Sequence, residues 1–324
     1  MSRYHFIICS KDAMYGQNLL QKMKEIIPQE LSFFLFHDIK KVISFSLNNS
    51  IKYLLIEENF PLSERNNIAA TFKYILMDKL DKEMGPPTIR GPEIAMLKFQ
   101  SASSMYRIIA SNIVSEQKTS DALAKREKTS NVPLKHEQSI HNDSTKIIGI
   151  YSPIGRIGKT RFAIQLGKEY AQQNPTLYIN MEEYAGETYF PGKLKENLGS
   201  LHYFAQQEEA NIGFRLSTMV GQMGLLDYLE PIDIVKDLHE IKSKEWIELF
   251  NRILHEGIYK VIFLDIGNGI NGLFEILRHC DVVYTHFLED STALSKLKNY
   301  HHNLIRTGYE DVLEHTIQKQ VEQL

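Results

Sequence analysis

The sequence is poor in the features that mark secreted, zinc-stapled or membrane-spanning chains. Only two cysteines occur in 324 residues, Cys9 and Cys280, which are too few for a disulfide framework or a zinc site. We therefore expect two buried thiols in a reducing compartment. The first apolar run, residues 6–9, is too short for a signal peptide, and no later run is long enough to cross a bilayer. These absences predict a cytoplasmic protein without direct membrane insertion, in which any membrane contact is peripheral and made through partners.

Charge and histidine placement exclude further classes. The formal net charge is -3, so the chain lacks the basic excess of a general nucleic-acid binder, and we expect no specific nucleic acid as a partner. The histidines, including His301 and His302, have no companions at zinc-ligand spacing, and no Ser-His-Asp or Cys-His nucleophile is evident. With 43% hydrophobic and 24% charged residues, the chain can bury a sizeable core, and we expect two domains.

Polar residues dominate one internal stretch. Between positions 116 and 145, EQKTSDALAKREKTSNVPLKHEQSIHNDST, apolar residues are sparse, charges of both signs mix and Pro133 interrupts any helix. We interpret this stretch as a flexible linker; a helical connector over Asp121–Lys128 is an alternative that leaves the same division. The predicted domains are residues 1–115 and 146–324.

The first domain alternates short apolar strands with helical segments. Five strands alternating with helices predict a small parallel sheet that is doubly wound, with helices on both faces. We expect strands at Tyr4–Cys9, Leu31–Phe36, Tyr53–Ile56, Tyr74–Met77 and Ile94–Phe99, and helices at Asn18–Ile27, Ile39–Leu47, Arg65–Thr71 and Ser103–Val114.

In element order, this domain resembles a response-regulator receiver domain. A working receiver carries an acidic cluster after its first strand and an Asp at the end of its third, because Mg²⁺ and the phosphoryl group bind those carboxylates. Here the first strand ends Cys9-Ser10-Lys11 and the third ends Glu57-Glu58, whereas Lys98 stands where a receiver carries its Lys. The resemblance implies a degenerate receiver-like (flavodoxin-like) domain that binds something without being phosphorylated.

The segment Lys146–Leu166, KIIGIYSPIGRIGKTRFAIQL, has the layout of a phosphate-binding loop. An apolar strand stops at a glycine-containing loop, and Gly158-Lys159-Thr160 opens an amphipathic helix. Such a loop needs small residues so that backbone N–H groups converge on an anion, a Lys for the β and γ phosphates, and a hydroxyl for Mg²⁺. The pattern G-x-x-x-x-G-K-[ST] fails only at its first position, which is Pro153. We predict a nucleotide site, with an ordinary strand-to-helix turn as the alternative; its loop residues are Gly155, Arg156, Ile157, Gly158, Lys159, Thr160 and Arg161.

Two further strands are expected to end beside this loop. Thr176–Asn180 is followed by Glu182, and Val261–Asp265 is followed by Gly267. Ligands of open α/β sheets bind beyond the carboxyl ends of the strands, so these residues should converge on the phosphate loop. A strand-terminal Asp can hold Mg²⁺ through water, and a nearby Gly lets a backbone N–H reach a γ phosphate. Asp265 is therefore predicted to hold the metal, while for Glu182 the alternative of a loop acid without function is equally open.

At these residues the chain resembles the ParA/MinD branch of P-loop ATPases, whose loop reads K-G-G-x-G-K-[ST]. Within that branch, a receiver-like domain ahead of the ATPase is similar to TadZ and CpaE, the localisation factors of Flp-type tight-adherence pilus systems. The text LDIGNGINGLFEILRHCDVVYT, residues 264–285, is also similar to the segment after the second switch in TadZ-like proteins of clostridial type. The resemblance implies a three-layer α/β/α NTPase domain, ATP and Mg²⁺ as cofactors, an ATP-favoured homodimer, and pilus or secretion-system proteins as partners.

Departures from the family pattern bear on turnover. Aligned backwards from Gly158, the family's signature Lys falls on Ile154 and its second loop Gly on Arg156. Loss of that cross-dimer cation is expected to cost several kcal/mol of transition-state stabilisation, on the order of an arginine finger's effect. The family's D-x-D corresponds to residues 180–182, which retain one carboxylate of two. The resemblance implies weak or slow hydrolysis, with these roles: Lys159 on the phosphates, Thr160 and Asp265 on Mg²⁺, Gly267 on the γ phosphate and Glu182 on the attacking water.

Three functional interpretations follow from this pattern. The first is a nucleotide-switched localisation ATPase, and the second is a scaffold of the same fold that has lost ATP. The third, a small-molecule phosphotransferase, is the least favoured, because few cationic residues besides Arg156 and Arg161 accompany the loop.

Two apolar patterns lie outside the predicted site. The apolar residues from Met219 to Leu229 are expected to pack as helical core. The C-terminal tail is expected to form an amphipathic helix, and its acidic polar face favours docking on the domain or on a partner over lipid. The apolar face of that helix would carry Leu313, Ile317, Val321 and Leu324.

Overall fold

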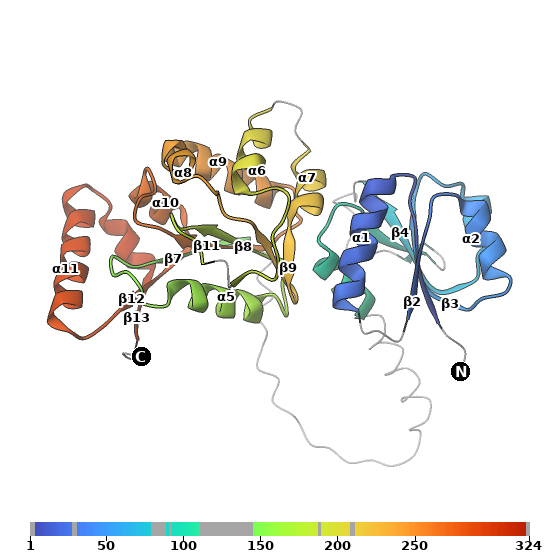
Figure 1. Cartoon of the computed structure of the whole chain (residues 1–324), viewed down its shortest axis with the longest axis horizontal. Helices are drawn as coiled ribbons and strands as arrows, with labels where there is room; N and C mark the ends of the chain where they lie inside the picture. Colours follow the sequence, from blue (N-terminus) through green and yellow to red (C-terminus); the bar gives the residue numbers. More distant parts are fainter. Residues whose placement is uncertain are drawn as a thin grey trace, which may run out of the picture.

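The computed structural model describes residues 4–27, 31–78, 89–90, 93–110, 145–186, 189–207 and 211–321. Each half of the chain forms a mainly parallel sheet with helices on both faces (Figure 1). The α/β architecture expected from the sequence is therefore confirmed. The predicted linker lies outside the described residues except for Thr145, so the domain boundaries stay a prediction.

The first sheet has the strand order β2-β1-β3-β4-β6-β5. Only the short pair β5 and β6 is antiparallel, so the five parallel strands follow the 2-1-3-4-5 order of flavodoxin-like domains. This order agrees with the receiver-like element order seen in the sequence. The strands are β1 (His5–Cys9), β2 (Ser32–Phe36), β3 (Ile51–Glu57), β4 (Ala70–Met77), β5 (Ile89–Arg90) and β6 (Glu93–Leu97).

Helices cover both faces of the first sheet, because its central strands carry buried apolar side chains on both sides. Met23 of α1 and Met105, in a helix over residues 102–110, pack on one face, while Val42 of α2 packs on the other. The free thiol of Cys9 is buried in the second of these cores. The helices are α1 (Ala13–Ile26), α2 (Ile39–Ser46) and α3 (Leu62–Arg65).

The second sheet has the strand order β13-β12-β7-β11-β8-β10-β9, and all neighbours are parallel except β10 and β9. Its central strands β7, β8 and β11 are almost wholly buried, which explains why they read as continuous apolar runs. The strands are β7 (Lys146–Tyr151), β8 (Thr176–Met181), β9 (Gly221–Met223), β10 (Leu226–Leu229), β11 (Val261–Ile266), β12 (Val282–Phe287) and β13 (Thr316–Gln320).

Two helical layers enclose the second sheet, which gives the three-layer α/β/α arrangement. Figure 1 shows α5 on one face and α6, α8 and α9 on the other. The larger core lies under the latter helices and contains the fully buried Trp246 and the buried free thiol of Cys280. The helices are α5 (Lys159–Tyr170), α6 (Leu198–Ala205), α7 (Ile212–Met219), α8 (Val235–Glu240), α9 (Ser243–His255), α10 (Leu273–His279), α11 (Ser291–Arg306) and the 3-10 helix η2 (Glu310–His315). Among the helices of the described ranges, none is both long and apolar enough to cross a membrane.

The predicted helix over Arg65–Thr71 is wrong. α3 ends at Arg65, and β4 already begins at Ala70. Thr71 and Phe72 are β-branched and aromatic residues, which favour an extended backbone, and pairing with β3 satisfies the backbone hydrogen bonds of this segment. Arg65 itself turns its guanidinium to Glu93 at 3.1 Å, fixing the end of the helix.

The predicted C-terminal helix is also wrong. Residues 310–315 form η2, and β13 then pairs in parallel with β12. The β-branched Thr316 and Ile317 favour a strand, and the open edge of β12 supplies the hydrogen-bonding partners. The tail therefore docks on the domain, as expected, but as a strand; Leu324 lies outside the described residues.

The apolar residues from Met219 to Leu229 are buried core, as expected, but they are not one helix. Met219 ends α7, and the following residues form the antiparallel pair β9 and β10. Gly224 makes the turn with a φ of 71°, a conformation that a residue with a Cβ adopts only at a cost. The positive φ available to Gly224 therefore allows a hairpin turn here, although the flanking apolar residues have helical spacing.

Polar side chains of the first half bind the second half of the chain. Lys22 of α1 donates to the carbonyl of Ser217 at 2.6 Å, and Figure 1 shows α1 beside α7. Arg107 donates to the carbonyls of Ala171 and Asn174 at the end of α5. A cation at this end satisfies carbonyls that lack helical partners and complements the helix dipole. The helix α5 thus ends against the first half of the chain.

A buried carboxylate joins the same two parts. Asp227 of β10 is 1% exposed, and it accepts hydrogen bonds from Ser103 at 3.0 Å and from Tyr259 at 2.8 Å. Burial raises the pKa of Asp227, while the nearby charge of Lys22 and these hydrogen bonds oppose that shift. The carboxylate is therefore held by the donors around it.

We expect Asp227→Ala to lower the free energy of unfolding by about 1–3 kcal/mol, because the buried hydroxyls of Ser103 and Tyr259 lose their acceptor. Urea unfolding measures this loss. Asp227→Asn keeps an acceptor and should recover most of it, and Glu248→Ala, at an exposed site on α9, should change stability little. An Asp227→Ala variant as stable as the parent would contradict the structural role.

Candidate functional site

Three neighbouring parallel strands, β7, β11 and β8, end at one edge of the second sheet. Asp265 of β11 is in register with Ile150 of β7 on one side and with Asn180 of β8 on the other. The loop after β7 leads into α5, and Glu182 directly follows β8. The structure therefore brings together the loop between β7 and α5 and the two acidic residues that the sequence placed beside it.

The loop between β7 and α5 leaves its backbone open. Gly158 is the N-cap of α5 with a φ of 80°, and no side chain caps this helix end. A Cβ placed on Gly155 or Gly158 would meet no atom within 4 Å. The first turn of α5 therefore has no capping side chain and follows two glycines with open space beside them, an arrangement that favours an anion at the helix N-terminus.

The two isoleucines of the loop hold it on the neighbouring elements. Ile154 is 7% exposed and Ile157 is 5% exposed, and both pack against Ala293 of α11 in a small apolar cluster. Ile154 therefore faces inward and anchors the loop. Ile157 contributes its backbone to the loop, while its side chain belongs to the same cluster.

The Lys159 side chain is nearly buried and lies at the centre of the site. Its Nζ atom is 2.6 Å from Oε1 of Glu182 and donates to the carbonyl oxygen of Ile266 at 3.0 Å. The same ammonium lies 5.8 Å from the ring centre of Tyr151. The Glu182 carboxylate thus forms an ion pair with the ammonium that a phosphate would contact. A phosphate would have to displace this carboxylate in order to bind Lys159.

Asp265 is fully buried at the end of β11. Its Oδ2 atom accepts a hydrogen bond from Tyr178 at 3.0 Å, and Asn180 in turn donates to the Tyr178 oxygen at 3.0 Å. Burial raises the pKa of Asp265 to about 6, although the hydroxyl of Thr160 and the charge of Lys159 lower it. The Thr160 hydroxyl is near enough to this carboxylate to lower its pKa, while Oδ1 has no partner in hydrogen-bond geometry.

The residues around Asp265 fit a magnesium ion. A buried carboxylate oxygen without a partner, beside a threonine hydroxyl, is the kind of hard oxygen donor that Mg²⁺ prefers. Among the described residues, no group of three or more His, Cys, Asp or Glu is placed to hold a metal on its own. Mg²⁺ commonly uses one or two protein oxygens and completes its shell with water and phosphate, so Thr160 and Asp265 suffice as the protein's share.

Glu183 holds the second loop of the site. Its carboxylate accepts a hydrogen bond from the backbone N–H of Gly269, and a Cβ on Gly267 or Gly269 would collide with it. The backbone N–H of Gly267, which the sequence suggested for a γ phosphate, donates to the carbonyl of Met181 at 3.2 Å. At this edge of the sheet, Glu182 therefore pairs with the Lys159 ammonium, and the adjacent Glu183 accepts the hydrogen bond of the Gly269 N–H.

Two predicted loop residues lie away from this centre. Arg156 is exposed and has a φ of 58°, a conformation that is uncommon for a residue with a side chain. Arg161 is also exposed and lines a hollow on the outer side of α5 together with Gln165 and Lys168. Neither guanidinium is among the groups that contact Lys159 or Asp265.

Sequence reasoning missed the groups that orient the predicted residues. Tyr178 and Tyr151 lie in buried strands, where an aromatic residue reads as core, and nothing marks their hydroxyls as polar partners. Glu183 did carry a signal, since it neighbours Glu182 after a strand end, but two adjacent acids do not say which one reaches the lysine. Nothing in the sequence indicated that the backbone carbonyl of Ile266 would accept a hydrogen bond from Lys159.

The carboxylate that ends the third strand of the first sheet is bound by neighbouring residues. Glu57 of β3 is 2% exposed and accepts hydrogen bonds from Ser10, Asn59 and the backbone of Lys11, while Lys98 forms an ion pair with it at 3.0 Å. Burial raises the pKa of Glu57, but the hydrogen bonds from Ser10, Lys98 and the Lys11 backbone, with the charge of Lys98, outweigh burial, so the net shift of the pKa is downward. Lys98 lies at the end of the third strand, and its partner there is the carboxylate of Glu57.

Comparison with known proteins gives structural similarities only. No family model and no curated protein matches the chain. It is similar to a ParA family ATPase from Chlorobium tepidum TLS, with 15% identity, a TM-score of 0.45, and coverage of 56% of this chain and 85% of that one. It is also similar to a putative plasmid partition protein from Borrelia burgdorferi B31 bound to AMPPNP, with 17% identity, a TM-score of 0.42, and coverage of 56% and 88%. The MinC:MinD complex from Aquifex aeolicus is similar at 14% identity, with a TM-score of 0.42 and coverage of 54% and 68%.

Proposed function

We propose that the chain binds ATP with Mg²⁺ at the loop between β7 and α5 and that the bound nucleotide switches a localisation or assembly activity. One observation carries the proposal: the uncapped N-terminus of α5, the Lys159 ammonium and the unpartnered oxygen of Asp265 lie at one edge of the sheet. These are the donors that a phosphate chain and its metal need.

Each side chain has a proposed part in holding the nucleotide. Lys159 and the backbone of residues 155–160 bind the phosphates, and Thr160 with Asp265 would hold Mg²⁺, which supplies charge neutralisation between the phosphates. Glu182, once displaced from Lys159, is free to orient a water near the phosphates. Gly267 would have to release its hydrogen bond to Met181 before its N–H could reach a γ phosphate.

Hydrolysis is proposed to be slow. The signature lysine position carries Ile154, which is buried in the loop's apolar anchor, so it supplies no cation to a partner subunit. We propose an ATP-favoured homodimer, because a ligand that binds only the dimer stabilises it by mass action. The pilus or secretion system as the assembly served rests on the resemblance to TadZ and CpaE. The proposed cytoplasmic address rests on the low cysteine count and on the shortness of the apolar runs.

A nucleotide-free scaffold is the second candidate, and the Lys159–Glu182 ion pair is the observation that favours it. At 2.6 Å, this pair neutralises the cation of the loop without any ligand. If the pair is permanent, the same fold would serve as a fixed adaptor.

Titration calorimetry of ATP into the purified full-length chain, with and without Mg²⁺, separates the two candidates. The proposal expects saturable binding that Mg²⁺ strengthens. Absence of heat at millimolar ATP, confirmed by a second method such as a thermal shift, would replace the nucleotide switch with the scaffold.

Glu182→Gln is expected to raise ATP affinity about three- to tenfold, because ATP no longer has to displace a carboxylate from Lys159. The same titration measures this gain. Glu169→Gln, at an exposed site on α5, is the matched control and should leave affinity within about twofold. Unchanged or weaker ATP binding by Glu182→Gln would show that the ion pair does not compete with the nucleotide.

A further inference from the structure

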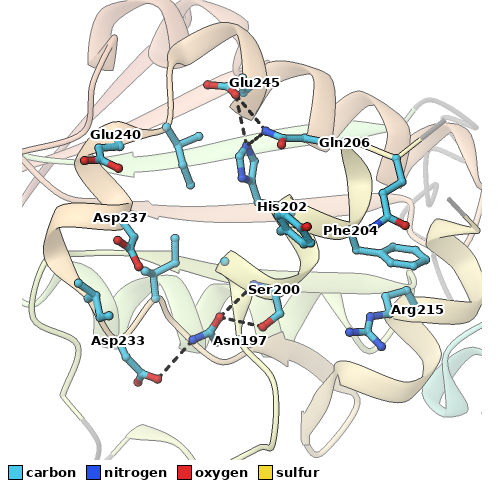
Figure 2. A pocket seen from close by; sticks show the side chains of 16 residues that line it. Asn197, Ser200, His202, Phe204, Gln206, Arg215, Asp233, Asp237, Glu240 and Glu245 are labelled. Carbon is cyan, nitrogen blue, oxygen red and sulfur yellow. Dashed lines mark hydrogen bonds and ion pairs between the residues drawn. The ribbon is translucent and has the colours of Figure 1, made fainter.

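A second concave site lies on the other helical layer, away from the phosphate loop. It has a volume of about 790 Å³ and is formed by α6, α7, α8 and the start of α9. Figure 2 shows Asp233, Asp237 and Glu240 along one side of it and Phe204 with Arg215 on the opposite side. We call this site the α6–α9 groove.

The lining of the α6–α9 groove is acidic, because Asp233, Asp237, Glu240 and Glu245 stand against a single arginine, Arg215. Arg215 is 2.8 Å from Glu196 and lies over the ring of Phe204. Burial lowers the pKa of His202, so its imidazole is neutral at physiological pH. Asp233 accepts a hydrogen bond from Asn197 at 3.3 Å, and Glu240 is 3.5 Å from Nζ of Lys236. The carboxylate of Asp237 has no hydrogen-bond or ion-pair partner within the described part of the chain.

Apolar side chains stand exposed on the same groove. Tyr203 of α6 is 71% exposed and Ile234, just before α8, is 58% exposed. Solitary exposed apolar residues are ordinary, but here two of them flank a hollow lined by carboxylates. A ligand that satisfies both features must carry positive charge and apolar groups together.

The α6–α9 groove also connects to the loops of the candidate nucleotide site. Ile232 and Asp233 line it and also line a second hollow, of about 440 Å³, whose other wall includes Glu183. On α8, His239 lies against Gly269, the residue whose N–H binds Glu183. The helix that supplies the acids of the groove therefore contacts the loop that Glu183 holds.

We propose that the α6–α9 groove docks a basic amphipathic segment of a partner protein. Its Lys or Arg side chains face Asp233, Asp237 and Glu240, and its apolar side chains cover Tyr203 and Ile234. Charge complementarity selects the sign of the partner. The exposed apolar rim selects a peptide over a small polyamine, which has no apolar side chains to bury. This docking does not depend on nucleotide binding, so it stands or falls separately from the proposed ATP site.

Fluorescence anisotropy with two designed 14-residue peptides tests the proposal on the full-length chain at physiological salt. One labelled peptide carries Leu at helical i, i+3, i+4 spacing with Lys elsewhere, and the other replaces each Lys by Glu. We expect the Lys peptide to bind at least about tenfold more tightly than the Glu peptide. Asp237→Lys should weaken it about fivefold or more, and Tyr203→Ser about threefold.

Matched substitutions elsewhere decide whether the groove is the site. Glu289→Lys and Leu47→Ser alter an exposed acid and an exposed apolar residue that do not line the groove, and should leave affinity within about twofold. Equal losses at these control sites would overturn the proposal in favour of diffuse charge attraction. Equal binding of the Glu peptide, or displacement by spermine together with no effect of Tyr203→Ser, would also overturn it. Self-association that Tyr203→Ser abolishes would assign the surface to a second copy of the chain instead.

Discussion

Lys159→Ala is expected to weaken ATP binding by at least about 100-fold, which corresponds to about 2.7 kcal/mol. The ammonium is nearly buried, so it meets a phosphate in a low-dielectric setting where charge interactions are strong. The loop backbone alone would remain to bind the anion, and without the cation the phosphates would face Glu182 and Asp265 unopposed. Calorimetry of ATP with Mg²⁺ against parent and variant measures the difference.

Two companion variants make this result interpretable. Lys159→Met keeps the length and packing of the side chain while removing its charge, so it should lose affinity as Lys159→Ala does. Lys168→Ala removes an exposed lysine near the far end of the same helix and should bind ATP as the parent does. If Lys159→Met retained the parent's affinity with an unchanged fold by circular dichroism, the site assignment would be wrong, whatever the fate of Lys159→Ala.

The parts of the site that could be predicted are those that depend on the pattern of residues close together in the sequence. An apolar strand, a glycine-bearing loop and a helix can be read from residues 146–166, and the end of a buried strand can be read at Asp265. Parallel neighbours end at the same edge, so these local features were enough to predict that Lys159 and Asp265 come together.

The parts that the sequence could not predict depend on partners distant in the chain. Glu182 fits the sequence as a loop acid or as a water-positioning group, and only the folded chain places it 2.6 Å from Lys159. The hydroxyl of Tyr178 finds Asp265 across 87 residues of sequence. The prediction of a C-terminal helix was wrong for the same reason. Pairing with the edge strand β12 decides the conformation of this segment, and the helical spacing of its apolar residues does not.

Asp265→Asn is expected to stabilise the metal-free protein while removing the benefit of Mg²⁺ for nucleotide binding. Burial raises the pKa of Asp265 from 3.8 to about 6, so folding disfavours its ionised form. The contribution of this group to stability is therefore fully present below pH 3.8, falls as pH rises toward 6 and is lost above it. That difference in pKa corresponds to about 3 kcal/mol, which is an upper limit on the gain from a neutral side chain at pH 7.5.

Urea unfolding in EDTA at several values between pH 5 and pH 7.5 measures this effect. The parent should lose stability across that range through Asp265, whereas the stability of Asp265→Asn should change less with pH, with the exposed Asp233→Asn as a control that behaves like the parent. In titrations with ATP, Mg²⁺ should strengthen binding to the parent and to the control but not to Asp265→Asn. The ionised Asp265 destabilises the metal-free protein because it is buried and its Oδ1 atom has no partner. A bound cation would give that oxygen a partner, which explains why an acid stands at this position. An Asp265→Asn variant that is less stable at pH 7.5 and still responds to Mg²⁺ would instead assign Asp265 a purely structural role, as the acceptor for Tyr178.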